Sequence, residues 1–503
     1  MGEWLSRKIV NFVTLFIVSS NLTLSNLSML LTIIFLPLFA CFFLCFIDKS
    51  KHIFIRNFGL FWSLLILNVC CAMFFFFDPT VTYFQFLSSN SWFNLVNINC
   101  LFGVDGLALI MILLTAFLTP ICIILCWNRS LVNNAKDYII AYFFLESILF
   151  AVFSSLDIML FYLLFEAVLI PMFLIIGFYG SRGRKIRSAY MLFLYTLVSS
   201  LVMFLAILYI YFKFGSTDYL VLKTVVFDSF SEKLCWCAFF LSFAVKMPLM
   251  PFHIWLPEAH CEAPTSGSVI LAGILLKLGG FGFLRYSIGL FFDSSAFFAP
   301  FVFVISILGI VYASLTTVQQ VDLKKIIAYS SVGHMGVVCI GIFSNVSQSL
   351  LGSILLMVSH GVVSGALFLC IGILYERYNT RLIKYYAGLL TTMPIFSTFF
   401  TVFTMANIGL PGTNSFIGEF LIILGCFLVN SWASLFCASG MVLGGAYSLW
   451  LLNRILFGNI KNFSITEYQD LTRLEFYYLL PFGFLTILLG VYPELLICYL
   501  YMI

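Results

Sequence analysis

Seven ionisable side chains stand well inside long apolar stretches of this 503-residue chain. They are Glu146, Glu166, Lys246, Lys277, His334, His360 and Glu419. A charge buried in a membrane helix costs about 2.5–3.5 kcal/mol even on a lenient scale, so such residues usually serve a function. Buried Lys and Glu exchange protons when their separation changes, and His passes protons between its two ring nitrogens near neutral pH. These residue types therefore predict a proton relay.

Two structural interpretations compete with the relay. A long side chain near a helix end can extend its charge to the membrane surface, and Arg285 fits that description. A buried ion pair can also do no more than fix helix packing, and the two histidines can be satisfied packing residues. Lys246 and Glu166 lie too deep in their apolar runs to reach the surface easily. The relay is therefore the stronger hypothesis for these two.

The composition excludes a water-soluble domain. Hydrophobic residues make up 62% of the chain and charged residues 9%, with a mean hydropathy of +1.10. Soluble domains carry about a quarter charged residues. The chain is therefore predicted to be a polytopic membrane protein. Its 60 Phe residues are a weak hint of an A+T-rich genome, such as that of an organelle.

Motifs for metals and redox cofactors are missing from the sequence. The 15 Cys residues form no C-x-x-C pair, so the usual spacing of zinc and iron–sulfur ligands is absent. Five residues near a proline-rich segment lack the H-E-x-x-H spacing and are predicted to be polar lining: His253, Glu258, His260, Cys261 and Glu262. We expect no metal, nicotinamide, flavin or cluster on this chain.

Apolar windows of about 20 residues predict an all-α fold of about fourteen transmembrane helices. The predicted spans are 28–47, 53–77, 104–126, 138–155, 157–178, 189–212, 234–262, 267–290, 297–317, 326–343, 349–375, 391–430, 434–457 and 476–500. With this count, most Lys and Arg residues fall in loops on one side of the membrane. The basic loops should face the compartment of synthesis.

Two of these spans are predicted to be discontinuous. The first break covers 246–264 and contains four prolines; the second covers 408–420 and contains Pro411 and Gly412. Transporters place such breaks at ion sites, in matching positions of inverted repeats. Each break falls in the fourth of five spans, which predicts two inverted five-helix repeats. The predicted regions are 1–130 (N-terminal helices), 131–290 (first repeat), 291–458 (second repeat) and 459–503 (last loop and helix).

The segments around these residues resemble one known family, the antiporter-like membrane subunits of respiratory complex I. Six motifs carry the resemblance: GVDGLALIMILLTAFLTPICI (103–123), FYLLFEAVLIPMFLIIGFYGSR (161–182), AVKMPLMPFHIWLPEAHCEAPTSGSVILAGILLKLGGFGFLR (244–285), LKKIIAYSSVGHMG (323–336), SHGVVSGALF (359–368) and GLPGTNSFIGEF (409–420). They cover most of 100–455. The first hundred residues and the tail after 456 match less well.

The resemblance implies a role for each buried charge. Glu166 and Lys246 correspond to the family's Glu–Lys pair that controls protonation, and Lys277 to a relay toward the centre. The remaining matches are His334 and His360 on the central polar axis, Glu419 on the broken helix that hands the proton to the far side, and Glu146, an acid found in many members only.

The expected function is therefore proton translocation within NADH:ubiquinone oxidoreductase, driven by quinone reduction elsewhere. NADH, FMN, iron–sulfur clusters and ubiquinone are expected on other subunits. Expected partners are neighbouring membrane-arm subunits and lipids, with no nucleic acid. The expected location is the mitochondrial inner membrane with the basic loops in the matrix, or else a bacterial plasma membrane. A cation/proton antiporter subunit and a structural membrane scaffold are the alternatives.

Overall fold

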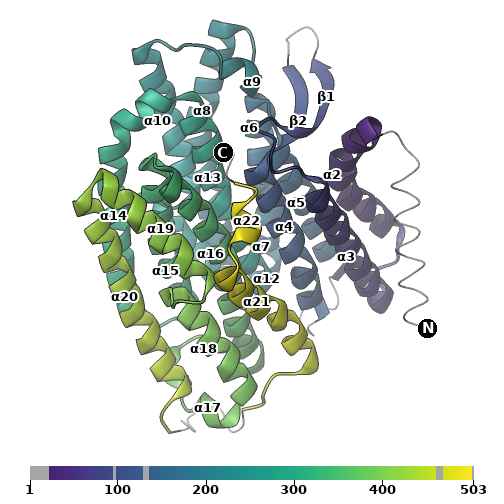
Figure 1. Cartoon of the computed structure of the whole chain (residues 1–503). Coiled ribbons are helices and arrows are strands. Elements are labelled where there is room, and N and C mark those ends of the chain that lie inside the picture. The colour runs from purple at the N-terminus through teal and green to yellow at the C-terminus, as the bar shows by residue number, and fades with distance from the viewer. Residues whose placement is uncertain (1–21, 94–97, 128–134, 460–467, 501–503) are drawn as a thin grey trace.

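Long helices build almost the whole protein (Figure 1). The computed structural model describes residues 22–93, 98–127, 135–459 and 468–500. Within them, 12 helices are long and apolar enough to cross a membrane. These are Met29–Phe46, His52–Phe76, Gly106–Trp127, Ala135–Ser154, Ile158–Tyr179, Lys185–Phe214, Thr265–Ile288, Phe292–Gln319, Leu323–Phe343, Ser347–Tyr378, Ser431–Leu456 and Arg473–Val491. The predicted helical membrane fold is confirmed, whereas the count of fourteen spans and the inverted repeats stay predictions.

Two further segments consist of shorter helices separated by a break, as the sequence predicts. The first is α10 (Ser229–Lys246), a 3-10 turn (Phe252–Ile254) and α11 (Trp255–Glu262). The second is α18 (Pro394–Ile408) followed by α19 (Asn414–Val429).

Proline and glycine chemistry explains both breaks. Pro248 and Pro251 have no N–H to continue the helix, and the indole N–H of Trp255 donates to the freed carbonyl of Val245 at 2.9 Å. In the second break, Gly409 (φ +83°) and Gly412 (φ +92°) adopt left-handed conformations that other residues rarely take. The two breaks therefore have different local causes.

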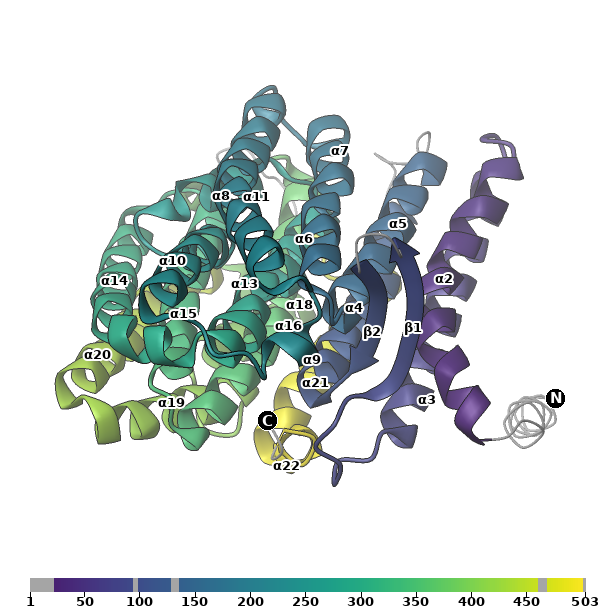
Figure 2. The ribbon, with the colours of Figure 1, turned by 90° about the horizontal axis from the view of Figure 1, so that it is seen from above.

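One helix lies at the centre of the bundle. In α16 (Ser347–Tyr378) the whole apolar window is buried, whereas α14 (Phe292–Gln319) and α20 (Ser431–Leu456) are each about one third buried. The outer helices α14 and α20 lie at one side of the bundle, away from α2 (Leu22–Phe46) and α3 (His52–Phe76) (Figure 2). Their exposed Phe, Leu and Val side chains fit contact with lipid or other membrane subunits.

Helices α4 (Gly106–Ile124), α12 (Thr265–Ile270), α15 (Leu323–Phe343) and α21 (Arg473–Val491) pack against α16, as do α18 and α19. The bundle is completed by α5 (Ala135–Ser154), α6 (Ile158–Ala167), α7 (Leu169–Tyr179), α8 (Lys185–Phe214) and α13 (Leu276–Gly282). The short helices α9 (Tyr219–Leu222) and α17 (Leu389–Thr392) lie at opposite ends of the bundle, and α22 (Glu494–Ile497) follows α21. We refer to the end where α17 lies as the basic-loop end.

A two-stranded sheet was not predicted from the sequence. Strands β1 (Gln85–Phe93) and β2 (Ile98–Val104) pair antiparallel, with Ser89 opposite Leu101. The hairpin lies at the end of the bundle opposite α17 (Figure 1). Its polar residues, such as Ser88, Ser89 and Ser91, give no strong strand signal, which is why the sequence reading missed it.

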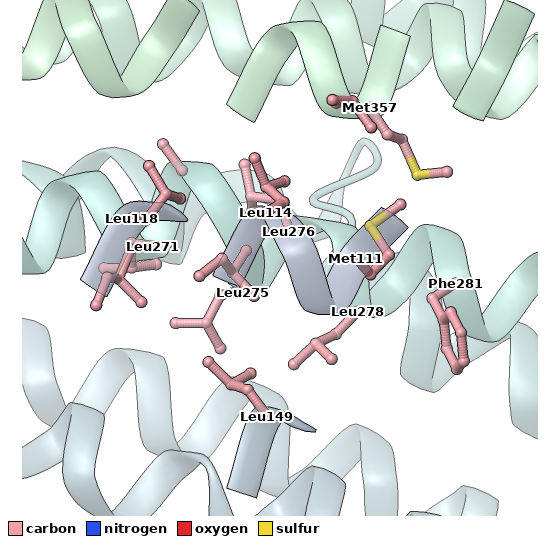
Figure 3. Close-up of a cluster of buried hydrophobic side chains, with 14 of the residues drawn as sticks. Met111, Leu114, Leu118, Leu149, Leu271, Leu275, Leu276, Leu278, Phe281 and Met357 are labelled. Carbon is pink, nitrogen blue, oxygen red and sulfur yellow. The ribbon is translucent and has the colours of Figure 1, made fainter. Parts of the chain in front are cut away.

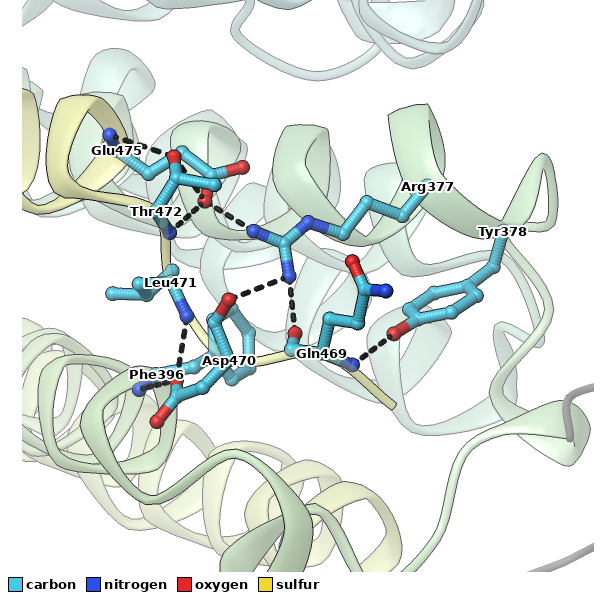
Figure 4. Close-up of polar contacts among 8 residues, drawn as sticks. All are labelled: Arg377, Tyr378, Phe396, Gln469, Asp470, Leu471, Thr472 and Glu475. Atoms are coloured by element: carbon cyan, nitrogen blue, oxygen red, sulfur yellow. Dashed lines mark hydrogen bonds and ion pairs between the residues drawn. The ribbon is translucent and has the colours of Figure 1, made fainter. Parts of the chain in front are cut away.

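Helix α21 is held to the bundle by a polar cluster at the basic-loop end (Figure 4). Arg377, at the end of α16, forms an ion pair with Glu475 and donates to the carbonyl of Asp470 at 3.0 Å. The carboxylate of Asp470 accepts the backbone N–H of Phe396 at 3.1 Å. Thr472 and Glu475 form a capping box that starts α21. Residues 9–20, which the sequence predicts to be an interfacial segment or an added span, lie outside the described residues.

Candidate functional site: a row of buried charges

Lys246 is the last residue of α10 and lies at the first break. It is 3% exposed, and its Nζ donates to the carbonyl of Phe165 at 2.8 Å. The same Nζ lies 3.3 Å from the centre of the Phe165 ring, so a carbonyl dipole and a π face both stabilise the ammonium. Phe165 belongs to α6, which ends two residues later. The C-terminal end of α6 thus positions the ammonium group of Lys246.

Glu166 lies beside this contact and is not joined to the lysine directly. Among the described residues, Glu166 and Lys246 form no ion pair, although the two charges are close enough to interact electrostatically. The Glu166 Oε1 atom is buried and has no hydrogen-bond partner. A bridging water or a small movement is therefore needed to connect them, and their pairing stays a prediction.

Lys277 is fully buried in α13, and its surroundings are apolar. Leucine, methionine and phenylalanine side chains from α4, α5, α16 and its own helix gather around this stretch (Figure 3). The Lys277 Nζ donates to the Ala272 carbonyl and lies 2.7 Å from Nδ1 of His360 on α16. Because an ammonium in such surroundings depends on these partners, Lys277 and His360 form one contacting pair.

Two π-helical turns flank Lys277 and were not predicted from the sequence. They cover Leu271–Leu275 and Phe283–Ile288. In the first, the carbonyl of Ala272 accepts from the side chain of Lys277, which lies five residues later. Such turns occur often at functional sites. Gly273 and Gly279–Gly280 in this stretch were a visible signal, since tight packing against neighbours needs glycine.

The row continues from His360 to the second break. The rings of His360 and His334 lie 5.8 Å apart between centroids, and Nδ1 of His334 lies 3.1 Å from Oε1 of Glu419. Glu419 is 3% exposed in the second turn of α19. Nε2 of both histidines and Oε2 of Glu419 are buried and without partners. Four helices thus bring Lys277, His360, His334 and Glu419 into one row.

Glu146 lies apart from this row. It is fully buried on α5, where Oγ1 of Thr119 donates to its Oε1 at 2.8 Å and its Oε2 has no partner. Within the described residues, no hydrogen bond or ion pair links Glu146 to Lys277 or to the histidines. The sequence reading did not identify Thr119, because a threonine in an apolar helix carries no charge signal.

The structure places two residues, Arg285 and His260, whose roles the sequence left open. Arg285 does not extend to the surface: its side chain is 2% exposed, and it forms an ion pair with Asp105. His260 does not line a water-facing break: it is fully buried and stacks on Phe368 with ring centres 4.7 Å apart. Both therefore support helix packing, which corrects the expectation of polar lining for His260.

A metal centre finds no support in the geometry. Across residues 22–93, 98–127, 135–459 and 468–500, no group of three or more His, Cys, Asp or Glu side chains is arranged to hold a metal ion.

Comparison with known proteins gives the chain its family. The transmembrane family of NADH:quinone oxidoreductase and Mrp antiporter subunits matches residues 155–444. The NADH-ubiquinone oxidoreductase chain 4 of Chondrus crispus is 54% identical over 91% of this chain and 93% of its own length. The same-named protein of Arabidopsis thaliana is 52% identical over 92% and 93%.

Solved structures share the fold. A chain of respiratory complex I from Thermus thermophilus superposes with a TM-score of 0.84 at 26% identity, covering 94% of this chain and 98% of its own. A chain of the Mrp complex from Dietzia has a TM-score of 0.82 at 16% identity, covering 94% and 96%, which shows a common fold. This chain therefore belongs to the antiporter-like family of membrane subunits, among the chain 4 proteins of NADH-ubiquinone oxidoreductase.

Proposed function

We propose that this chain is a proton-translocating membrane subunit of NADH:ubiquinone oxidoreductase. The observation that carries the proposal is the row Lys277–His360–His334–Glu419, which crosses four helices, has one gap between the two histidine rings and ends at a helix break. A scaffold needs buried charges that are satisfied, whereas three atoms of this row are buried and unpartnered. Unpartnered acceptors and donors suit groups that exchange protons.

The proton steps follow from the contacts. The Lys277 ammonium transfers a proton to Nδ1 of His360, so that an N–H bond breaks on the lysine and another forms on the ring. His360 then releases a proton from Nε2 toward His334, and the 5.8 Å between ring centres leaves room for a water or a ring rotation. Nδ1 of His334 passes a proton to the Glu419 carboxylate at 3.1 Å.

The Lys246–Glu166 region controls the charge at the other end of the row in this proposal. When water or a helix movement brings Glu166 against Lys246, the lysine keeps its proton; when they separate, the buried lysine releases it. Glu146 is assigned no step. NADH, FMN, iron–sulfur clusters and ubiquinone are placed on other subunits, and membrane-arm neighbours and lipids cover the exposed helices.

The proposed location is the mitochondrial inner membrane, with the basic loops in the matrix. The support is the ~50% identity to curated chain 4 proteins and the collection of basic loops at one end of the bundle. The likeness to the Mrp chain is one of fold alone, so a cation/proton antiporter role has weaker support than the oxidoreductase role.

The test is a pair of changes in the intact enzyme complex. Lys277→Met removes the first proton carrier while keeping a long apolar side chain, and Lys213→Met removes an exposed lysine at the other end of the bundle. We expect normal assembly in both, and loss of proton pumping coupled to NADH oxidation in Lys277→Met alone. Normal pumping by assembled Lys277→Met would exclude the proposed relay, and failed assembly in that variant would favour the scaffold role.

A further inference from the structure

A cavity beside the second break reaches past the row toward the basic-loop end. It offers about 30 Å³ to the centres of water molecules, and His334 and Glu419 line it. A water needs about 10–15 Å³ of such space and two to four polar partners. The cavity therefore has room for about two waters, provided that polar groups face it.

Three further polar side chains line the cavity. They are Ser330 on α15, Asn407 at the end of α18 and Tyr447 on α20, all at most 8% exposed. The Tyr447 hydroxyl lies within hydrogen-bonding reach of Asn407 and Ser330 and close enough to Glu419 to interact with its charge. These residues lie in otherwise apolar stretches, so their gathering here is specific.

Two of the three unpartnered atoms of the row belong to residues that line the cavity. Nε2 of His334 and Oε2 of Glu419 are both buried without hydrogen-bond partners. Orphaned buried polar atoms are rare and are usually satisfied by an ordered water. Water in this cavity would satisfy both.

The cavity extends along α15 from His334 toward the basic-loop end. Helix α15 starts at Leu323 beside Lys325, and the cavity residues Tyr329 and Ser330 lie between that start and His334. Lys325 pairs with Glu258 at 2.9 Å, and both side chains are about one third exposed. Tyr329 is one helical turn from Lys325, so the polar lining leads from the middle of the bundle to its basic-loop end.

We propose that this cavity holds ordered water and that Tyr447 and Ser330 carry protons between the basic-loop end and the His334–Glu419 pair, with Asn407 orienting the Tyr447 hydroxyl. In each transfer the Tyr447 O–H gives its proton to a cavity water while that water gives another proton to His334 Nε2. The Ser330 O–H gives its proton to the Tyr447 oxygen and takes one from water on the side of the basic-loop end, so every hydroxyl is restored and no electron changes hands. The inference rests on the proposed function and adds to it a branch from the row to the basic-loop end.

Gly333 offers a way to fill the cavity without disturbing its walls. It lines the cavity, and a Cβ added there meets no atom within 4 Å. Gly177 on α7 is a matched control, because a Cβ there also meets no atom and the residue does not line the cavity. Tyr447→Phe is the second variant, since it removes one hydroxyl and keeps the ring.

The experiment measures NADH-driven proton pumping in the intact complex, together with a cryo-EM map of its membrane arm. We expect ordered water between Glu419 and Tyr447, and pumping lowered about twofold or more by Gly333→Ala and by Tyr447→Phe, with Gly177→Ala unchanged. A dry cavity in the map, or normal pumping in both variants, overturns the branch. If Glu419→Gln lowers pumping in that case, the row itself still stands; if Glu419→Gln pumps normally, the proposed function fails.

Discussion

The two helix breaks place their charges in different surroundings. At the first, Lys246 rests on the carbonyl and ring of Phe165, within a shell that includes Phe161 and Phe243. At the second, Glu419 contacts His334 directly and faces a water-sized cavity. The first charge is therefore held by apolar packing, and the second by polar neighbours.

This difference teaches that a helix break is not by itself a proton channel. A charge held by packed side chains exchanges a proton when the packing moves, whereas a charge that faces a water-sized cavity can exchange it through water. Backbone approach limits such movement: a Cβ at Gly279 would lie 2.9 Å from the Met247 nitrogen, and one at Gly490 would lie 2.3 Å from the Gly412 carbonyl oxygen. The backbone at both breaks is therefore closely packed, so the side chains around each charge decide how it can exchange a proton.

The largest effect is expected from Lys246→Ala. Among the described residues at the first break, this lysine is the cation that contacts Phe165, so we expect coupled proton pumping to fall about a hundredfold or more. Pumping is measured in vesicles that contain the assembled complex. Lys213→Ala, which removes an exposed cation, serves as the control. Unchanged pumping in Lys246→Ala would mean that only the second break works.

A smaller loss is expected from Glu419→Gln. The amide keeps the shape of the side chain but cannot take a proton from His334, while cavity water still reaches the histidine; we therefore expect about a tenfold loss. The same vesicle assay measures it. Glu494→Gln, on the short helix α22, is the control. A loss as large as that of Lys246→Ala would contradict a hydrated second break with a parallel route.

Phe165→Leu tests how the ring of Phe165 holds the charge at the first break. The change removes the ring above Lys246 and keeps the accepting carbonyl, so the ammonium loses about 0.5–2 kcal/mol of stabilisation. We expect pumping to change a few fold and its pH profile to shift, measured against Phe178→Leu, an exposed phenylalanine of α7. An unaltered pH profile would show that the ring has no part in holding the lysine's charge.

The smallest effect is expected from Glu146→Gln. The glutamine carbonyl can still accept from Thr119 at the position of Oε1, and no described contact joins this residue to either break. Pumping should stay within about twofold of the unchanged enzyme, far below the loss in Lys246→Ala. A large loss in the assembled enzyme would place Glu146 in the relay after all.

Much of this architecture was predictable from the sequence, for identifiable reasons. Apolar length marks membrane helices, and Pro248, Pro251, Gly409 and Gly412 mark the breaks through local backbone chemistry. The charges stood out because a buried charge is costly anywhere in a membrane. The β-hairpin and the π-helical turns did not stand out, because strand pairing and helix bulges depend on neighbours distant in the sequence.

The sequence by itself determined which residues are charged, which segments are apolar enough to span and where the helices break. Only the tertiary structure decided the partners. It set Lys246 on a carbonyl and a ring of α6, joined His334 to Glu419 and left Glu146 with Thr119. It also made a cavity where five helices fail to fill the space between them. The physical reason is that partners and voids depend on packing between helices, which local backbone preferences do not encode.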